Sequence, residues 1–109
     1  MTRTFLHKWH DHDSAYINSE YGFCKVNIYP RDKVAELYDL IVYPEHRHQG
    51  YGKDLLVAAI AAARQHDCDV IVLWPDCEEW TKNWYGRNGF EPNPAYINHD
   101  FEVGWAKKL

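Results

Sequence analysis

The sequence lacks any long apolar run. Its longest uninterrupted apolar stretch covers residues 55–63, well short of the roughly 18 residues that a membrane-spanning helix needs. The first residues also lack the apolar segment of a secretion signal. Cysteine is scarce as well: Cys24, Cys68 and Cys77 form no Cys-x-x-Cys pair, which disfavours a disulfide framework or a zinc site. We therefore expect a cytoplasmic protein that does not associate with membranes.

Positive charge is in short supply. The chain has 12 Lys and Arg against 16 Asp and Glu, a formal net charge of −4. Affinity for nucleic acid comes mainly from Lys and Arg contacts to phosphates, so we expect no nucleic-acid partner, whereas a cationic substrate is compatible with this charge. Internal repeats, linkers and low-complexity tracts are also missing, and we expect a single domain over residues 1–109.

The remaining pattern alternates strands and helices. Apolar residues and turn signals predict strands at 4–9, 16–18, 23–29 and 34–43, a fully covered strand at 70–74, and final strands at Phe90 and at 101–107. Leu55, Leu56, Ala59, Ile60 and Ala63 have helical spacing, which predicts a helix from Gly52 to about His66. This order indicates an α+β fold, with a mixed sheet flanked by two main helices.

A second helix is predicted between Asp76 and Asn88. Asp76 is followed three residues later by Glu79, the spacing of an N-terminal capping box. Gly89 stands where a glycine commonly closes a helix.

Residues 40–53 carry the clearest chemical signal, because they combine a strand, a glycine-containing turn and the start of a helix. The segment is not a P-loop, which would need Gly and Ser or Thr where Arg47 and Asp54 stand. It is not a dinucleotide fingerprint either, because Leu55 occupies the position of the third glycine. Exposed amides at a helix N-terminus bind anions, so this segment predicts a cradle for a phosphate or pyrophosphate.

Two blocks of this sequence resemble the GNAT superfamily of N-acetyltransferases. Val42, Pro44, Arg47, Gly50 and Gly52 match its Val-x-Pro and Arg/Gln-x-x-Gly-x-Gly/Ala signature at the correct spacing. Residues 84–90, Trp-Tyr-Gly-Arg-Asn-Gly-Phe, are similar to its Phe-Tyr-x-x-x-Gly-Phe block. The resemblance covers residues 23–109 and implies a GNAT-like fold whose first helices are shortened or absent.

The resemblance implies acetyl-CoA as the cofactor. The strand end would pair with the pantetheine arm, and a backbone amide there would polarise the thioester carbonyl. The loop amides would hold the pyrophosphate. The cofactor-binding residues implied in this way are Leu40, Ile41, Val42, Arg47, His48, Gln49, Gly50, Tyr51, Gly52 and Lys53.

Two catalytic residues are implied. An alkyl ammonium must lose a proton before it can attack a thioester, and a carboxylate can accept that proton. Glu36 matches the base position of the protein-lysine acetyltransferases, and its spacing of six residues from Val42 predicts that both side chains share one face of the strand. Asp39, expected on the opposite face, is the weaker candidate. Tyr85 matches the tyrosine that serves the departing thiolate as a proton or hydrogen-bond donor.

The acceptor side of the site departs from the family. Many members have two helices between the first strands, but residues 10–15 are too few to form them. The acceptor site is therefore expected to be open, completed by a partner subunit as in a homodimer, or shaped by a large substrate. An acidic rim favours a cationic group on a protein, a lysine or an N-terminus, as the acceptor amine. The rim residues are Asp11, Asp13, Glu36, Asp76, Glu78 and Glu79.

Three functions remain open from these residues. The first is an acetyl-CoA-dependent N-acetyltransferase that transfers the acetyl group directly in a ternary complex. The second is a non-catalytic module that binds CoA or a protein, because Glu78 replaces an Asn that touches pantetheine in many members. The third is a metal-binding protein using His7, His10 and His12; their spacing suits no standard zinc site, so we expect a solvated polar loop and no metal there.

Overall fold

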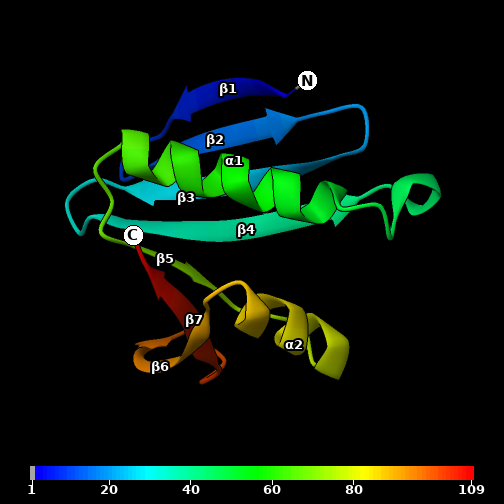
Figure 1. Cartoon of the computed structure of the whole chain (residues 1–109). Coiled ribbons are helices and arrows are strands. Elements are labelled where there is room, and N and C mark those ends of the chain that lie inside the picture. Colours follow the sequence, from blue (N-terminus) through cyan, green and yellow to red (C-terminus); the bar gives the residue numbers. More distant parts are fainter. Residues whose placement is uncertain (1) are drawn as a thin grey trace.

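The computed structural model describes residues 2–109, which form one seven-stranded sheet and two α-helices (Figure 1). The elements in chain order are β1 (Arg3–Lys8), β2 (Asp13–Asn18), β3 (Gly22–Tyr29), β4 (Val34–Val42), the 3₁₀ turn η1 (Pro44–His46), α1 (Tyr51–Gln65), β5 (Val70–Leu73), α2 (Glu79–Arg87), β6 (Glu91–Ile97) and β7 (Val103–Lys108). The predicted α+β class is confirmed.

The sheet has the strand order β1-β2-β3-β4-β5-β7-β6. Among the strands of the described chain, only β4 and β5 pair in parallel, and every other neighbouring pair is antiparallel. A parallel pair needs a crossover connection, and α1 provides it. The sheet is therefore mixed, as the sequence predicted.

Helix α1 lies lengthwise over β2, β3 and β4 (Figure 1). All five residues that predicted its apolar face are buried, and they pack against strand residues such as Val26, Ile28 and Ala35. Trp84 and Tyr85 of α2 pack against the same core. Within residues 2–109 no helix is long and apolar enough to cross a membrane.

Strands β4 and β5 are paired over only part of their length. Their register joins residues 34–36 of β4 to residues 70–72 of β5, and the two strands then diverge (Figure 1). In the part of the chain that the structure describes, no strand pairs with β4 from Leu37 to Val42 on that side. The backbone hydrogen-bonding groups along this edge are therefore available to another extended chain.

A β-bulge interrupts the pairing of β3 with β4. Val26 pairs with Leu37 and Lys25 pairs with Asp39, so Tyr38 is the extra residue on β4. An extra residue reverses the alternation of side chains beyond it.

The two ends of α2 show one wrong prediction and one confirmed prediction. The helix begins at Glu79 with Glu78 as its N-cap, whereas Asp76 accepts a hydrogen bond from the Glu78 amide at 3.0 Å and thus forms a turn before the helix. The glycine signal was correct: Gly89 has a φ of 92° directly after the helix.

The C-terminal strands also differ from expectation. The last strand begins at Val103 and excludes Phe101, which is 88% exposed with a φ of 62°. Phe90 precedes β6 and is buried in the core. Both residues are phenylalanine, so the residue type does not distinguish them. Only the tertiary structure shows that one lies in the core and the other in a turn.

Candidate functional site

The loop between β4 and α1 presents backbone amides without partners. Gly50 has a φ of 87°, a conformation that favours glycine, and a Cβ added there would meet open space. The first α-helical hydrogen bond runs from the Asp54 amide to the Gly50 carbonyl. Within the described residues, the amides of 48–53 donate no hydrogen bond. Unpaired amides at the positive end of a 15-residue helix are an arrangement that suits an anion, and we call residues 48–53 the cradle.

Contacts on both sides hold this loop in place. The Arg47 Nε atom donates to the Val42 carbonyl at 3.0 Å, so this guanidinium folds back onto the end of β4. The Tyr21 and Tyr51 rings stack with centroids 3.6 Å apart, and the Lys53 ammonium donates to the Asn88 side chain. The cradle is therefore largely preformed.

The unpaired edge of β4 leads into this loop. Leu40 and Val42 are half-buried and pack against the core beneath α1, whereas Ile41 is exposed on the other face. An extended arm that carries amides can pair with such an edge as an added strand. The implied pantetheine residues thus lie on a free strand edge that continues into the implied pyrophosphate residues.

Tyr85 faces the core from α2. Its ring packs edge-on against Trp84 and Phe90, with centroid distances of 5.0 and 5.6 Å. Burial raises the pKa of Tyr85 to about 12, and the nearby Asp76 carboxylate and Cys24 thiol add to the shift. The phenol is therefore protonated at neutral pH and can donate a hydrogen bond. Because Cys24 pairs with Leu40, the phenol lies near the unpaired part of β4.

Thr81, which has no role predicted from the sequence, lies on the same helix as Tyr85. It lies one helical turn before Tyr85, and its buried Oγ1 atom has no hydrogen-bond partner within residues 2–109. Buried hydroxyl groups nearly always have a partner, so this atom is available to a bound ligand or water. Its spacing of four residues from Tyr85 was the only signal in the sequence.

The prediction that Glu36 shares a face with Val42 is wrong. Cross-strand partners share a face: Val42 and Leu40 pair with Gly22 and Cys24 on the α1 side. Glu36 pairs with Asn27, on the opposite side of the sheet. The bulge at Tyr38 causes the reversal.

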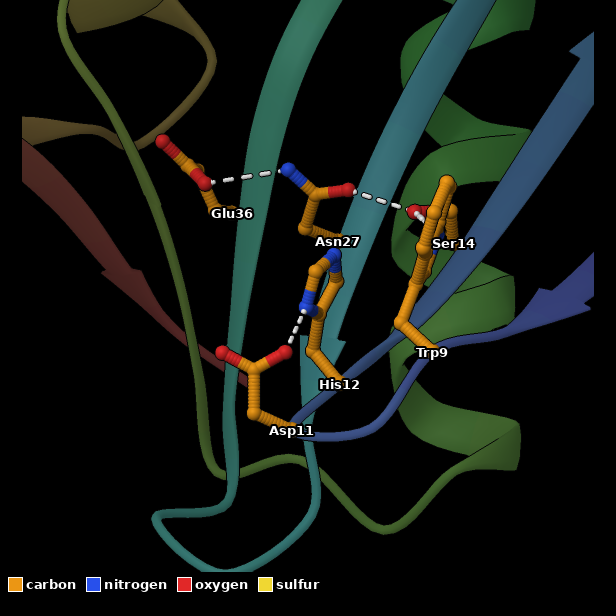
Figure 2. Close-up of polar contacts among 6 residues, drawn as sticks. All are labelled: Trp9, Asp11, His12, Ser14, Asn27 and Glu36. Carbon is orange, nitrogen blue, oxygen red and sulfur yellow. Dashed lines mark hydrogen bonds and ion pairs between the residues drawn. The ribbon is translucent and has the colours of Figure 1, made fainter.

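Glu36 lies at the end of a chain of side-chain hydrogen bonds (Figure 2). The Asn27 Nδ2 atom donates to Glu36 Oε1 at 3.2 Å. The Ser14 hydroxyl donates to Asn27 Oδ1 at 2.8 Å, and the Trp9 indole donates to Ser14 Oγ at 3.0 Å. None of these three residues was predicted from the sequence, although an Asn within an apolar strand was a signal.

The turn between β1 and β2 lies close to this chain and is not simply a solvated loop. The His12 ring stacks on Trp9 and Tyr29 at centroid distances of 6.0 and 5.2 Å, and its Nδ1 atom lies 2.7 Å from Asp11 Oδ1 (Figure 2). This hydrogen bond lowers the pKa of Asp11. Burial, followed by the charge of Glu36, raises the pKa of Tyr29. Asp11, His12, Tyr29 and Glu36 are therefore neighbours.

The six acidic residues expected at the rim do not gather in one place. Asp11 and Glu36 both lie close enough to Tyr29 to raise its pKa. Asp13 lies 3.8 Å from the Lys8 ammonium and pairs in register with the core residue Ile28. Asp76 lines a separate cleft of about 290 Å³ beside Lys82 and Glu102. Within residues 2–109 no group of three or more His, Cys, Asp or Glu side chains could hold a metal ion.

Comparison with known proteins supports the resemblance. The model of the acetyltransferase (GNAT) domain matches residues 9–92, and a search of curated proteins finds no match. Among solved structures, the PaiA N-acetyltransferase of Thermoplasma acidophilum in complex with coenzyme A is similar, with 22% identity over 88% of this chain and a TM-score of 0.69. This chain spans only 60% of that protein.

Two further structures share the architecture. A Klebsiella pneumoniae protein classed with the acyl-CoA N-acyltransferases is 26% identical over 91% of this chain and 73% of its own, with a TM-score of 0.72. An acetyltransferase of Bacillus subtilis in complex with CoA is 14% identical, and the match covers 100% of this chain and 99% of that protein with a TM-score of 0.71. The last likeness shows the same fold in a protein of the same size.

Proposed function

The chain belongs to the GNAT acetyltransferase family, and we propose that it transfers the acetyl group of acetyl-CoA to a primary amine. The observation that carries this proposal is the continuity of two unsatisfied surfaces: the unpaired edge of β4 and the unpaired amides of residues 48–53. One surface suits an amide-bearing arm, and the other suits a pyrophosphate. CoA has both parts in this order.

The residues present fit this cofactor. The amides of residues 48–53 would bind the pyrophosphate, and the edge formed by Leu40, Ile41 and Val42 would bind the pantetheine arm. The orphaned Thr81 Oγ1 atom would gain a hydrogen-bond partner. Bound acetyl-CoA supplies a thioester that is reactive toward a neutral amine.

The two ionisable candidates have different tasks. An alkyl ammonium has an ordinary pKa of about 10.4, so a base is needed at neutral pH, and Glu36 accepts that proton. A thiol has an ordinary pKa of roughly 8.5, below the value of about 12 for Tyr85. The Tyr85 phenol is therefore a weaker acid than the departing thiol, and it stabilises the thiolate by donating a hydrogen bond rather than by giving up its proton.

The acceptor that we favour is an amine on a protein, a lysine or an N-terminus. The helix-bearing face of the sheet is occupied by α1, whereas Glu36 opens onto the other face together with Asp11. Negative charge there favours a cationic group, and a short turn in place of long helices leaves room for a large substrate.

Calorimetry with acetyl-CoA tests the cofactor first. We expect binding in the micromolar range, and no binding at millimolar ligand would contradict the proposal. Mass spectrometry of a cell lysate incubated with isotope-labelled acetyl-CoA and the protein then identifies the acceptor, with a Glu36→Gln sample as the matched control.

One observation favours a non-catalytic role. Glu78, which stands where many family members have an Asn, is exposed at the N-cap of α2, and its negative charge offers no amide to pantetheine. Binding of acetyl-CoA without transfer to any amine in a peptide and polyamine panel would support a binding module over an enzyme.

A further inference from the structure

The hydrogen bonds that reach Glu36 all run in one direction. An indole N–H can only donate, so Ser14 must accept from Trp9. The single hydroxyl hydrogen of Ser14 is then directed to Asn27 Oδ1. With its oxygen occupied, Asn27 can present only its NH₂ group to Glu36. The donor at one end thus determines the amide orientation at the other end.

These hydrogen bonds belong to the folded interior and are not a chance surface contact. Ser14 is fully buried, and Asn27 is 6% exposed. Ser14 pairs with Asn27 across β2 and β3, and Asn27 pairs with Glu36 across β3 and β4. Buried polar groups with every partner in place hold one geometry, because any other arrangement leaves a polar atom unpaired.

The hydrogen-bond chain begins at Trp9, in the short turn between β1 and β2. The Trp9 amide donates to the His12 carbonyl at 2.8 Å and closes the turn. The Trp9 ring is 49% exposed, yet its Nε1–H points inward to Ser14 (Figure 2). The turn therefore supplies an inward-pointing donor from a half-exposed side chain.

We propose that Trp9, Ser14 and Asn27 are positioning residues that orient the Glu36 carboxylate for proton transfer, an inference that rests on the proposed function. Asn27 holds one carboxylate oxygen, and the other oxygen is directed away from Asn27 (Figure 2). That second oxygen takes one proton from the substrate ammonium, which leaves a neutral amine and a neutral carboxylic acid. The amine lone pair is then available to attack the thioester carbonyl.

Trp9→Phe is the mildest kinetic test, because it keeps an aromatic ring at this position and removes the N–H donor together with the five-membered ring of the indole. Ser14→Ala and Asn27→Leu remove the next two members of the chain. For each variant we expect kcat to fall roughly three- to tenfold, while KM for acetyl-CoA stays unchanged. Trp80→Phe is the matched control, since Trp80 is 69% exposed and lies outside the chain.

A double-mutant cycle separates positioning from a general loss of structure. In a Glu36→Gln background the same substitutions are expected to have no further effect on kcat, because the residue that they orient is gone. Equal losses in both backgrounds, or unchanged kcat for both Trp9→Phe and Ser14→Ala, would overturn the proposal.

Nitrogen-15 NMR tests the chain without any assay of transfer. Glu36→Gln is expected to shift the side-chain amide resonances of Asn27 and the indole N–H resonance of Trp9, while the Trp80 indole is unmoved. If the Trp9 indole resonance does not shift and its N–H proton exchanges freely with water, the proposed hydrogen-bond chain is wrong. Absence of transfer to every amine would instead count against the proposed function, so the two failures are distinguishable.

Discussion

Glu36 and Asp39 lie on the same face of β4, although three residues of strand normally place two side chains on opposite faces. Tyr38 is the extra residue of a bulge, so Glu36 pairs with Asn27 and Asp39 pairs with Lys25, two positions apart on β3. The two carboxylates nevertheless have different surroundings. Glu36 accepts from a nearly buried amide, whereas Asp39 lies opposite the ammonium-bearing Lys25.

This relationship predicts different effects for two isosteric substitutions. Glu36→Gln removes the proposed base and is expected to lower kcat by about 100-fold or more. Asp39→Asn is expected to change kcat by less than about threefold, because only Glu36 is held by the hydrogen-bond chain. Steady-state kinetics of both variants checks this, and a larger loss for Asp39→Asn would reverse the assignment.

Two glycine substitutions are expected to have opposite effects. Gly50→Ala forces a side chain into a φ of 87°, so we expect a loss of about 1 kcal/mol of unfolding free energy and weaker CoA binding. Gly86 lies in α2, where an added Cβ would make only an ordinary contact with Trp105 at 3.9 Å. Gly86→Ala is expected to raise stability by up to about 1 kcal/mol and to leave CoA binding unchanged. Urea unfolding and calorimetry measure both effects.

Thr81→Val tests the orphaned hydroxyl with a side chain of nearly the same shape. Removal of a buried, unpartnered polar atom is expected to raise the unfolding free energy of the free protein by about 1 kcal/mol. The same change is expected to weaken CoA binding, because the atom that the cofactor would satisfy is gone. Loss of stability together with unchanged affinity would show that Thr81 has no contact with the cofactor.

Tyr85→Phe removes the proposed hydrogen-bond donor to the thiolate. We expect kcat to fall by about tenfold or more, since hydrogen bonds to charged groups are the stronger ones, while the affinity for acetyl-CoA is retained. Tyr96→Phe on β6 serves as the control. Single-turnover kinetics is the suitable measurement, and an unchanged rate of the chemical step would leave Tyr85 with a packing role alone.

Alkaline pH is expected to destabilise the fold through Cys24 and Tyr85. Burial raises the pKa of each group to about 12, from ordinary values of 9.0 and 10.0. The folded state thus keeps both protons where the unfolded chain loses them, so the stability is fully present below the ordinary pKa values and is lost as the pH rises toward 12. The expected slope is about 1.4 kcal/mol per pH unit for each group.

Urea unfolding between pH 8 and roughly 11.5 measures this slope. Cys24→Ala is expected to flatten the curve from about pH 9 upward, and Tyr85→Phe from about pH 10 upward. Wild-type stability that does not change over this range would contradict the burial of both groups.

Local patterns determined much of this protein without a structure. The spacing of Leu55, Leu56 and Ala59 predicted the apolar face of α1, because a helix repeats over neighbouring residues. The turns at Gly50 and Gly89 could be predicted for the same reason, since the backbone conformation of a turn depends on a few adjacent residues. The segment from Val42 to Lys53 and the block around Tyr85 identified the family.

The tertiary structure decided which residues meet. The bulge at Tyr38 exists only in the pairing of β4 with β3, so the sequence alone placed Glu36 on the wrong face. The hydrogen-bond chain from Trp9 to Asn27 likewise depends on strand pairing, because it joins residues that are distant in sequence. Ser14 and Asn27, for example, are 13 residues apart. The sequence predicted the proposed cofactor half of the site because that half is one continuous segment, whereas the proposed base and its supports come from four elements that only strand pairing brings together.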